Sequence, residues 1–440
     1  MELKIEKLVY GGDGLARLSA DAHGRGKTVF LPYVLPGERV EASLLQGSTG
    51  FARARLNEVL SPAAERIVPE CPYFGRCGGC QYQHIAYEAQ LRYKAEILRE
   101  TLRRTAKLEL GVEVQTHASQ PWRYRNRTRM HVRHSPDFAL GYFRANSHEL
   151  LTVESCPISS PLINQGISAF WELGRIGKVP SAVHGLQFFA NHNDQAMLLE
   201  LYVRPEDERG KLTEFARAVM AQVPAITGAV LFVASPVEDE SRQLAPLSAI
   251  HTGPSTAIGA DHLFYHAAGH DYRVSGGSFF QTNRHLVDEL LNVATDGVQG
   301  QTAFDLYAGV GLFTVPLARK FGTVIAVEAS PHAVGDFLHN VSASVKIVRT
   351  TTEAFLQKQA KQYQPDFILL DPPRSGLGER ATTALCRTAA KVVTFVSCDP
   401  ATLSRDLQLL LESGFRVEQA HLFDLFPQTA HMETVLRLVR

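Results

Sequence analysis

The sequence has no excess of charge of either sign. It contains 45 basic and 45 acidic residues among 440, so its formal net charge is zero. Such a chain cannot hold a polyanion by bulk charge, and any nucleic-acid contact has to come from local basic patches. No run approaches the roughly 20 apolar residues of a membrane span, and no basic segment with an apolar core follows Met1. We therefore expect a cytoplasmic protein without a membrane segment.

Cysteine is also scarce, with six residues in the whole chain. Disulfides are rare in the cytoplasm, so clustered cysteines there indicate metal binding or catalysis. The chain has no long internal repeat and no low-complexity tract. Its length exceeds what one hydrophobic core supports, which predicts two or three domains. The oligomeric state cannot be derived from these features, and a monomer is the default expectation.

Three regions differ in pattern. Residues 1–60 carry short alternating segments broken by glycine, which predicts a small β-barrel. After a linker at 61–70, the region up to residue 274 is a mixed α+β domain, mostly strand-like beyond residue 115. Apolar residues at helical spacing predict a helix over 85–107 in this part. Residues 275–440 alternate strand and helix, which predicts an α/β domain with a parallel sheet.

The last region opens with a nucleotide-binding pattern. A strand "TAFDLY", a turn "AGVG" and a helix precede a second strand that ends in Glu328. An acidic residue about 20 positions after a glycine-rich first turn is placed to hold ribose hydroxyls. The third glycine of a dinucleotide fingerprint is replaced by Thr314, so a dinucleotide is disfavoured. With Asp305 before the turn, the pattern favours S-adenosylmethionine.

Two later strands end in reactive side chains. Asp371 follows the apolar run "DFILL", and Cys398 follows the apolar run that begins at Val392. Ligands of open α/β sheets bind beyond the carboxyl ends of the strands, so Glu328, Asp371 and Cys398 should line one crevice. Most free cysteines are buried apolar residues, and Cys386 fits that description. Cys398 does not, because proline follows it in a loop at a strand end.

Five motifs in order resemble the uracil-5 RNA methyltransferases: "FFQTN", "DLYAGVGLF", "LLDPPRSGL", "SCDPATLSRDL" and "FPQTAHMETVLRL". The segment "GGDGLARL" resembles the TRAM domain, an OB-like barrel that binds RNA. The resemblance implies a Rossmann-like SAM-dependent methyltransferase domain behind this barrel and a central iron-sulfur domain. One departure is Ala308, where many members of the family have a cysteine that is not the nucleophile.

The resemblance also implies the site residues. Cys398 would add as a thiolate to carbon 6 of uracil, which makes carbon 5 nucleophilic enough to take a methyl group. Glu433 of "HMETVL" would then remove the proton from carbon 5. The methyl donor, S-adenosylmethionine, would be held by Gln281, Tyr307, Glu328 and Asp371. Asp399 carries the wrong charge to help a thiolate form, so we expect its carboxylate to point away from the sulfur.

A second group of cysteines forms an independent signal. Cys71, Cys77 and Cys80 are spaced C-x5-C-x2-C, and Cys156 remains as a fourth ligand. Four thiolates suit either structural zinc or a [4Fe-4S] cluster. Because relatives with this spacing carry the iron-sulfur cluster, the resemblance implies that group. His84 lies nearby, but marks the start of a helix more plausibly than a ligand.

For RNA contacts the best candidate is "WRYRNRTRMHVRH", residues 122–134. A strand there would place five arginines and His131 on one face. A flipped-out uridine could be walled by Phe279 and Phe280. The architecture favours 23S ribosomal RNA as substrate over a tRNA uridine-54 type of target. A non-catalytic RNA-binding iron-sulfur protein is the remaining alternative, but it would have no reason to keep Cys398 and Glu433.

Overall fold

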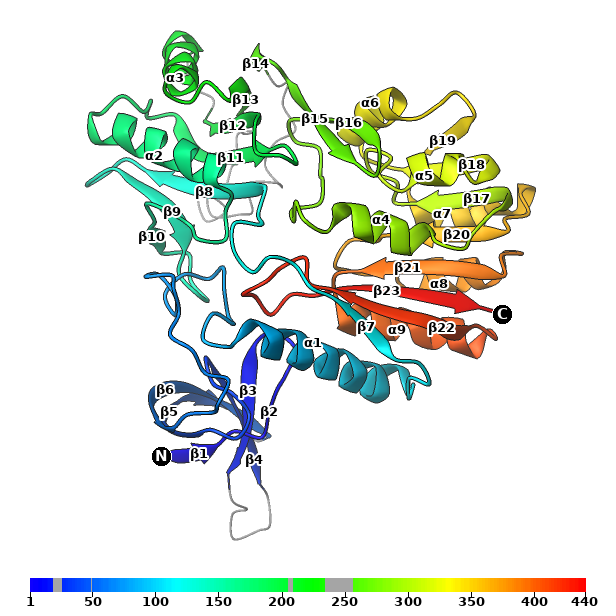
Figure 1. The fold of residues 1–440 in the computed structure, drawn as a ribbon, viewed down its shortest axis with the longest axis horizontal. Helices are drawn as coiled ribbons and strands as arrows, with labels where there is room; N and C mark the ends of the chain where they lie inside the picture. The colour runs from blue at the N-terminus through cyan, green and yellow to red at the C-terminus, as the bar shows by residue number, and fades with distance from the viewer. Residues whose placement is uncertain (19–25, 49, 205–208, 234–255) are drawn as a thin grey trace.

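A computed structural model describes residues 1–18, 26–48, 50–204, 209–233 and 256–440. The predicted central domain, 61–274, includes residues 205–208 and 234–255, which lie outside the described part. A small all-β unit carries the N-terminus, a mixed unit follows it, and an α/β unit holds the C-terminus (Figure 1). None of the described helices is long and apolar enough to cross a membrane.

The N-terminal unit is one sheet in the order β1-β5-β6-β4-β3-β2. Small and aliphatic side chains, among them Ala16, Val29 and Leu31, fill its interior. Gly14 is required here, since a Cβ atom would come within 2.3 Å of Val34. The strands are β1 (Glu2–Lys4), β2 (Lys7–Leu8), β3 (Asp13–Leu18), β4 (Lys27–Pro32), β5 (Arg39–Gly47) and β6 (Phe51–Ser61).

The central sheet has the order β10-β9-β8-β11-β12-β13-β14, and helices α2 and α3 share its apolar core. Ser160 caps α2 by accepting a bond from the Ile163 amide, and proline follows at the first helical position. The elements are β8 (Arg127–Arg133), β9 (Ala139–Phe143), β10 (Leu150–Thr152), α2 (Pro161–Arg175), β11 (Val183–Ala190), β12 (Met197–Val203), α3 (Arg209–Gln222), β13 (Ile226–Val233) and β14 (Thr256–Gly259).

The helix expected over 85–107 is α1 (Tyr87–Thr101), followed by a π-helical turn, η1 (Leu102–Ala106). Lys107, in the left-handed conformation, ends it. Its buried face, including Ile97, Leu98 and Leu102, belongs to the core of the C-terminal unit and packs against α9. Strand β7 (Val114–His117) then joins the C-terminal sheet at its edge, parallel to β22. The chain therefore visits the C-terminal unit before it builds the central sheet.

The C-terminal sheet has the order β19-β18-β17-β20-β21-β23-β22-β7. Its strands are β17 (Gly300–Leu306), β18 (Phe321–Glu328), β19 (Val345–Arg349), β20 (Phe367–Leu370), β21 (Val392–Ser397), β22 (Arg416–Phe423) and β23 (Glu433–Val439). Pairs from β19 to β21 are parallel, whereas β23 runs antiparallel to both its neighbours. Successive side chains point to opposite faces, so Ala303 and Phe304 belong to different cores.

Helices cover both faces of this sheet (Figure 1). One core contains residues of α1, α7, α8 and α9, and the other contains residues of α4 and α5. The predicted α/β fold is thus confirmed. The hairpin β15 (His262–Ala267) and β16 (His270–Ser275) packs into the second core. The helices are α4 (Val287–Thr295), α5 (Thr314–Ala318), α6 (Pro331–Asn340), α7 (Thr352–Lys358), α8 (Glu379–Cys386) and α9 (Pro400–Glu412), with a 3-10 turn, η4 (Ala360–Gln362).

Candidate active site

Four predicted residues stand at one edge of the C-terminal sheet. Glu328 is the last residue of β18, and the other three follow β17, β20 and β21 directly: Tyr307, Asp371 and Cys398. These four strands are neighbours and mutually parallel, so their carboxyl ends meet. Glu433 arrives from the opposite direction. It opens β23, whose antiparallel register pairs Thr434 with Ser397, and this pairing brings the Glu433 carboxyl to the Cys398 end of β21.

Tyr307, which directly precedes the glycine turn after β17, lines a cavity of about 320 Å³. Glu328 accepts hydrogen bonds from the amides of Gly309 (2.8 Å) and Ser330 (2.6 Å), which fixes its carboxylate under the turn. Tyr307 has a φ of 64°, a left-handed value that is costly for a side chain with a Cβ atom. The cavity is lined by Tyr307, Val327, Glu328, Ala329, Thr350, Thr351, Thr352, Glu353, Pro373, Ser375, Gly376 and Leu377.

Of the predicted site residues, only Tyr307 and Glu328 line this cavity, and Gln281, Asp305, Asp371, Cys398 and Glu433 lie outside its lining. Gln281 is buried, and its carbonyl oxygen accepts a bond from the Asn126 amide group (3.0 Å). Asp305 is buried and accepts a hydrogen bond from the Thr314 hydroxyl. Burial raises the pKa of Asp305 to about 7. Asp305 therefore supports the turn from beneath.

Cys398 is partly buried between the strand end and helix α9. Asp399 caps that helix, because one carboxylate oxygen accepts bonds from the amides of Ala401 and Thr402, each 2.9 Å long. Its other oxygen accepts a bond from the Tyr10 hydroxyl at 2.9 Å. Both oxygens of the Asp399 carboxylate are thus hydrogen-bonded, one to the start of the helix and the other to Tyr10. Tyr10 belongs to the N-terminal unit, which therefore reaches the residue next to Cys398.

Burial raises the pKa of each acid of the site, and for Cys398 and Glu433 the neighbouring acids raise it further. Burial, followed by the charges of Glu433 and Asp371, raises the pKa of Cys398 to about 12. Burial raises the pKa of Asp371 to about 7. Burial and then the charge of Asp371 raise the pKa of Glu433 well above its usual range, and its Oε1 atom has no hydrogen-bond partner. Like charges in one desolvated space disfavour each other's ionisation. In the free protein the thiol therefore keeps its proton.

Arg374, in the loop after Asp371, is the cation that opposes this effect. It lowers the pKa of both Cys398 and Glu433, although less than burial raises them. Its guanidinium lies 3.5 Å from the ring of His431. Neither Arg374 nor Tyr10 is among the residues predicted from the sequence. The signal for Arg374 was present, since it directly follows the two prolines of "LLDPPRSGL".

Four cysteines lie near enough in the central unit to influence one another's acidity. Burial raises the pKa of Cys71, Cys77 and Cys80, and Cys156 adds to the shift of each. All four are free thiols. Within the described residues, no group of three or more His, Cys, Asp or Glu side chains is arranged to hold a metal ion. The donor set still suits a metal, because four partly buried thiols from two segments share one space. His84 packs between Tyr33 and Phe74.

The prediction of an exposed basic stripe at 122–134 is wrong. The strand begins only at Arg127, which is buried with its guanidinium 4.0 Å from the Phe189 ring centre. Arg129 lies over the Tyr202 ring and donates to its hydroxyl at 2.7 Å. Alternation predicts which side chains share a face, but the buried aromatic partners decide that this face is covered. Arg123 and Arg133 remain exposed.

The pair of phenylalanines expected to wall the uracil also separates. Phe280 belongs to the apolar core, with its ring centre 4.5 Å from that of Tyr265, and so cannot wall an open pocket. Phe279 is 68% exposed. The two residues follow the turn at 276–277 outside any strand, and only one of the two side chains is buried.

A groove of about 930 Å³ runs between the N-terminal unit and the end of α1. Arg103 and Arg104 of η1 form one wall, whereas Phe30 and Phe51 form the other. The two rings are in edge contact at 6.3 Å, and Phe51 is 46% exposed. Tyr10 also lines this groove, so it extends to the hydroxyl that binds Asp399 beside Cys398.

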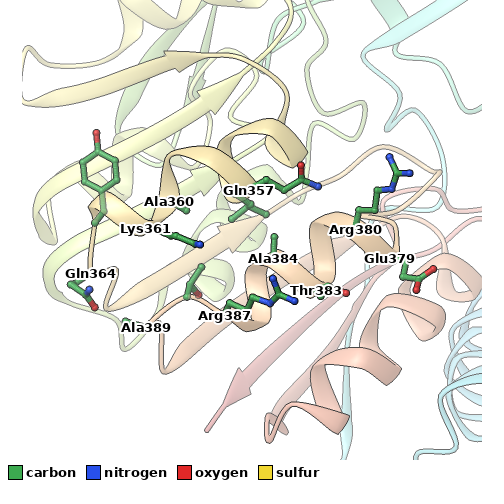
Figure 2. Close-up of a pocket in the computed structure, with 13 residues that line it drawn as sticks. Gln357, Ala360, Lys361, Gln364, Glu379, Arg380, Thr383, Ala384, Arg387 and Ala389 are labelled. Atoms are coloured by element: carbon green, nitrogen blue, oxygen red, sulfur yellow. The ribbon is translucent and has the colours of Figure 1, made fainter.

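A different pocket, of about 770 Å³, lies between α7 and α8. Figure 2 shows Lys361 and Arg387 among its lining side chains, which come from these helices and the segments after them. None of the predicted site residues lines it. Its position at the helix layer, away from the strand ends, makes it unsuited to any reaction that involves the Cys398 sulfur.

Comparisons with known proteins agree with this geometry. A family model described as tRNA (Uracil-5-)-methyltransferase matches residues 261–440, and a model of the TRAM domain matches residues 1–56. An uncharacterized RNA methyltransferase of Aquifex aeolicus is 30% identical, over 100% of this chain and 98% of its own length. A 23S rRNA (uracil(1939)-C(5))-methyltransferase of Haemophilus parainfluenzae is 29% identical over 99% and 96%.

Among solved structures, a tRNA (uracil-54, C5)-methyltransferase of Pyrococcus abyssi, in complex with S-adenosyl-L-homocysteine, has the same fold. The TM-score is 0.75 at 21% identity, with 99% of both chains covered. The fold and its crevice define a SAM-dependent methyltransferase. The chain belongs to the RNA uracil-5-methyltransferase family, and it methylates carbon 5 of uracil in RNA with S-adenosylmethionine. The resemblance read from the five motifs is confirmed.

The raised pKa of Cys398 predicts its reactivity in the free protein. Only the thiolate is alkylated, and with a pKa of about 12 the thiolate fraction grows about tenfold per pH unit between pH 7 and 10. Iodoacetamide should therefore label Cys398 more slowly than glutathione at pH 8, as followed by peptide mass spectrometry. Arg374→Met should slow the labelling further. Labelling of the native protein at the glutathione rate would contradict the raised pKa, and the urea-unfolded protein serves as control.

Proposed function

We propose that Cys398 and Glu433 carry out the methyl transfer, and that the target is a uridine of 23S ribosomal RNA. The observation that carries the first part is the antiparallel pairing of β23 with β21, which brings a partly buried thiol and a buried carboxyl with an unpartnered oxygen to one strand end. A thiol and a base on the same face of a bound ring are what addition to carbon 6 and proton removal at carbon 5 require.

The chemistry needs both groups in sequence. The sulfur of Cys398 forms a bond to carbon 6, and the electron pair of the 5,6 double bond becomes nucleophilic at carbon 5. Bound S-adenosylmethionine would supply the methyl group and a positive charge that favours the anionic forms of nearby acids. Glu433, which has to lose its own proton to solvent first, then takes the proton from carbon 5, the double bond re-forms, and the thiolate leaves. Each thiolate consumed in the addition is thereby restored.

The thiol proton has to leave before or during the addition. Asp371 is the neighbour best suited to accept it, because its pKa of about 7 leaves it partly ionised near neutral pH. Arg374 stabilises the resulting thiolate. We propose that Tyr307, Glu328, Gln281 and Asp371 hold the methyl donor, with Glu328 on the ribose. Its two oxygens each accept one amide bond and retain lone pairs for hydroxyl groups.

Substitution of the two reacting groups should separate addition from elimination. Cys398→Ala should lower kcat roughly 10⁴-fold or more and form no covalent RNA adduct. Glu433→Gln should also lose turnover, but should accumulate an RNA adduct that survives denaturing electrophoresis, because the sulfur adds while the proton stays. Donor affinity, measured by calorimetry, should be retained in both variants. Turnover by Cys398→Ala at the parent rate would refute the assigned nucleophile.

Ribosomal RNA is the proposed substrate class. Two relatives that match this chain at 29% identity over 99% of its length are 23S rRNA (uracil(1939)-C(5))-methyltransferases. The Pyrococcus tRNA enzyme matches at 21% identity, which supports the fold alone. Because ribosomal RNA is made in the cytoplasm of bacteria and free thiols persist there, we also infer a cytoplasmic protein. We propose that it acts as a monomer, since one chain carries every residue that the mechanism uses.

The groove between the N-terminal unit and η1 is the proposed track for the RNA. Arg103 and Arg104 can bind phosphates, and Phe51 offers a ring on which a base can stack. The groove ends at Tyr10, next to the nucleophile's neighbour Asp399. A single-stranded segment bound there would deliver its next nucleotide to the crevice. Phe279, which is exposed, is then the remaining candidate for contact with an extruded uracil.

Unmethylated 23S RNA should be a substrate and a tRNA transcript should not, as measured by transfer of labelled methyl groups. Arg103→Ala with Arg104→Ala should raise KM for this RNA and reduce the salt dependence of binding by about 0.7 for each phosphate that the variant no longer neutralises. Arg380→Ala, an exposed arginine at the separate pocket of Figure 2, is the matched control and should change neither. Preferential methylation of tRNA would overturn the proposed target.

We further propose that Cys71, Cys77, Cys80 and Cys156 hold a [4Fe-4S] cluster. The four free thiols share one space, and the raised pKa values of the first three mean that only a strongly bound cation would keep them as thiolates. Such a cluster would fix two distant chain segments to each other.

Protein purified without oxygen should be brown, with about four irons per chain. Cys80→Ser should lose the visible absorbance. Stoichiometric zinc in a colourless protein would refute the cluster and favour a structural zinc site.

A further inference from the structure

The loop 424–432, between β22 and β23, delivers Glu433 to the site. In Figure 1 it is the red loop that projects from the sheet toward the middle of the molecule. Loops normally lie on the surface because their backbone groups need water. In this loop, however, all residues except Phe426 and His431 are buried. Its backbone must therefore find partners within the protein.

Three side chains from distant parts of the chain bind its first half. Asn283 donates to the carbonyl oxygens of residues 424 (3.4 Å) and 425 (3.1 Å). Lys94 of α1 forms a fully buried ion pair with Asp424 at 2.6 Å and donates to the carbonyl of Phe426 at 3.1 Å. The Tyr124 hydroxyl donates to the carbonyl of Pro427 at 3.0 Å.

Gln428 is the most tightly bound residue of the loop. The backbone amide of Gln428 donates to the side-chain oxygen of Gln90 (3.0 Å). In return, the side-chain amide of Gln90 donates to the side-chain oxygen of Gln428 (2.9 Å). Its carbonyl accepts bonds from the amides of Gln81 (3.1 Å) and Tyr82 (2.9 Å). Its φ of 69° is a left-handed value, which a non-glycine residue keeps only when its surroundings impose it. These bonds are what impose it.

Gln81 adds a second bond and links the loop to the cysteines. Its side-chain oxygen accepts from the Ala430 amide at 3.1 Å, three residues before Glu433. In the chain, Gln81 directly follows Cys80. A Cβ atom on Gly12 would come within 2.9 Å of Gln81 and 3.1 Å of Ala430, so the backbone of the N-terminal unit packs directly against both residues. The segment that contains three of the cysteines is thus hydrogen-bonded, through Gln81, to the loop that directly precedes Glu433.

We propose that Gln81 and Gln90 are positioning residues for Glu433, and that the cysteine segment acts on the proton-removal step through them. This rests on the proposed role of Glu433. Cys398 is held separately, by β21 and by the Asp399 cap of α9, and neither of these supports passes through the loop. Loosening the loop therefore displaces the carboxyl more than the sulfur. Addition to carbon 6 should continue while elimination slows.

This separation distinguishes positioning from a general loss of stability. Gln81→Met keeps the size of the side chain but removes the acceptor for the Ala430 amide. It should lower kcat roughly 10- to 100-fold, as a displacement of about 1 Å does, with KM for RNA changed little. A methylated covalent RNA adduct should accumulate during turnover, because its breakdown has become limiting. Gln90→Met should show the same adduct.

Gln81→Glu retains an acceptor at this partly buried position and should restore turnover without the adduct. Gln187→Met, a buried glutamine on β11 outside the loop's contacts, is the matched control and should form no adduct. Loss of activity in Gln81→Met and Gln90→Met without adduct accumulation would overturn the positioning role. If Glu433→Gln itself accumulates no adduct, the proposed base is wrong instead, so the two failures are distinguishable.

Discussion

The pairing of one antiparallel strand with a parallel sheet underlies the whole site. If every strand were parallel, only residues that follow the strands would lie near the thiol of Cys398, and no residue that opens a strand would reach it. Because β23 runs against β21, its first residue lies where β21 finishes, and a carboxyl that is 35 positions further along the chain meets the sulfur. The same pairing buries Glu433 at the end of a sheet, which is why its proton is held so firmly. Geometry and acidity thus have one origin.

The acidity of Cys398 and Glu433 is therefore set in part by repulsion between negative charges. A thiol and two carboxyls lie near one another in a desolvated part of the strand ends, and Arg374 is the described cation that lowers the pKa values of Cys398 and Glu433. This arrangement keeps the sulfur unreactive toward adventitious electrophiles while the crevice contains no substrate. A positively charged methyl donor would be attracted to Asp371, whose pKa of about 7 leaves it partly ionised near neutral pH.

Much of the fold could be predicted from the sequence, because local patterns determine strand ends. The alternation beyond residue 275, the glycine turn before Glu328 and the family motifs led to the confirmed fold and enzyme class. The assignments of Cys398 and Glu433 stay predictions. The stripe at 122–134 failed, because periodicity cannot show that Phe189 and Tyr202 cover Arg127 and Arg129. Tyr10 and Gln81 were missed for a related reason: their partners are more than 300 residues away in the chain.

The hydrogen bond between Tyr10 and Asp399 means that the N-terminal unit contributes directly to the structure beside Cys398. A module that merely recruits a substrate could be exchanged for another of similar affinity. Here the N-terminal unit supplies the Tyr10 hydroxyl to Asp399, which caps the helix that begins beside Cys398, and Tyr10 also lines the groove. Grafting a foreign RNA-binding module in its place would leave one oxygen of that cap open to solvent. The carboxylate of Asp399 thus joins the N-terminal unit to the helix beside Cys398, so a change in one of these two parts alters the surroundings of the other.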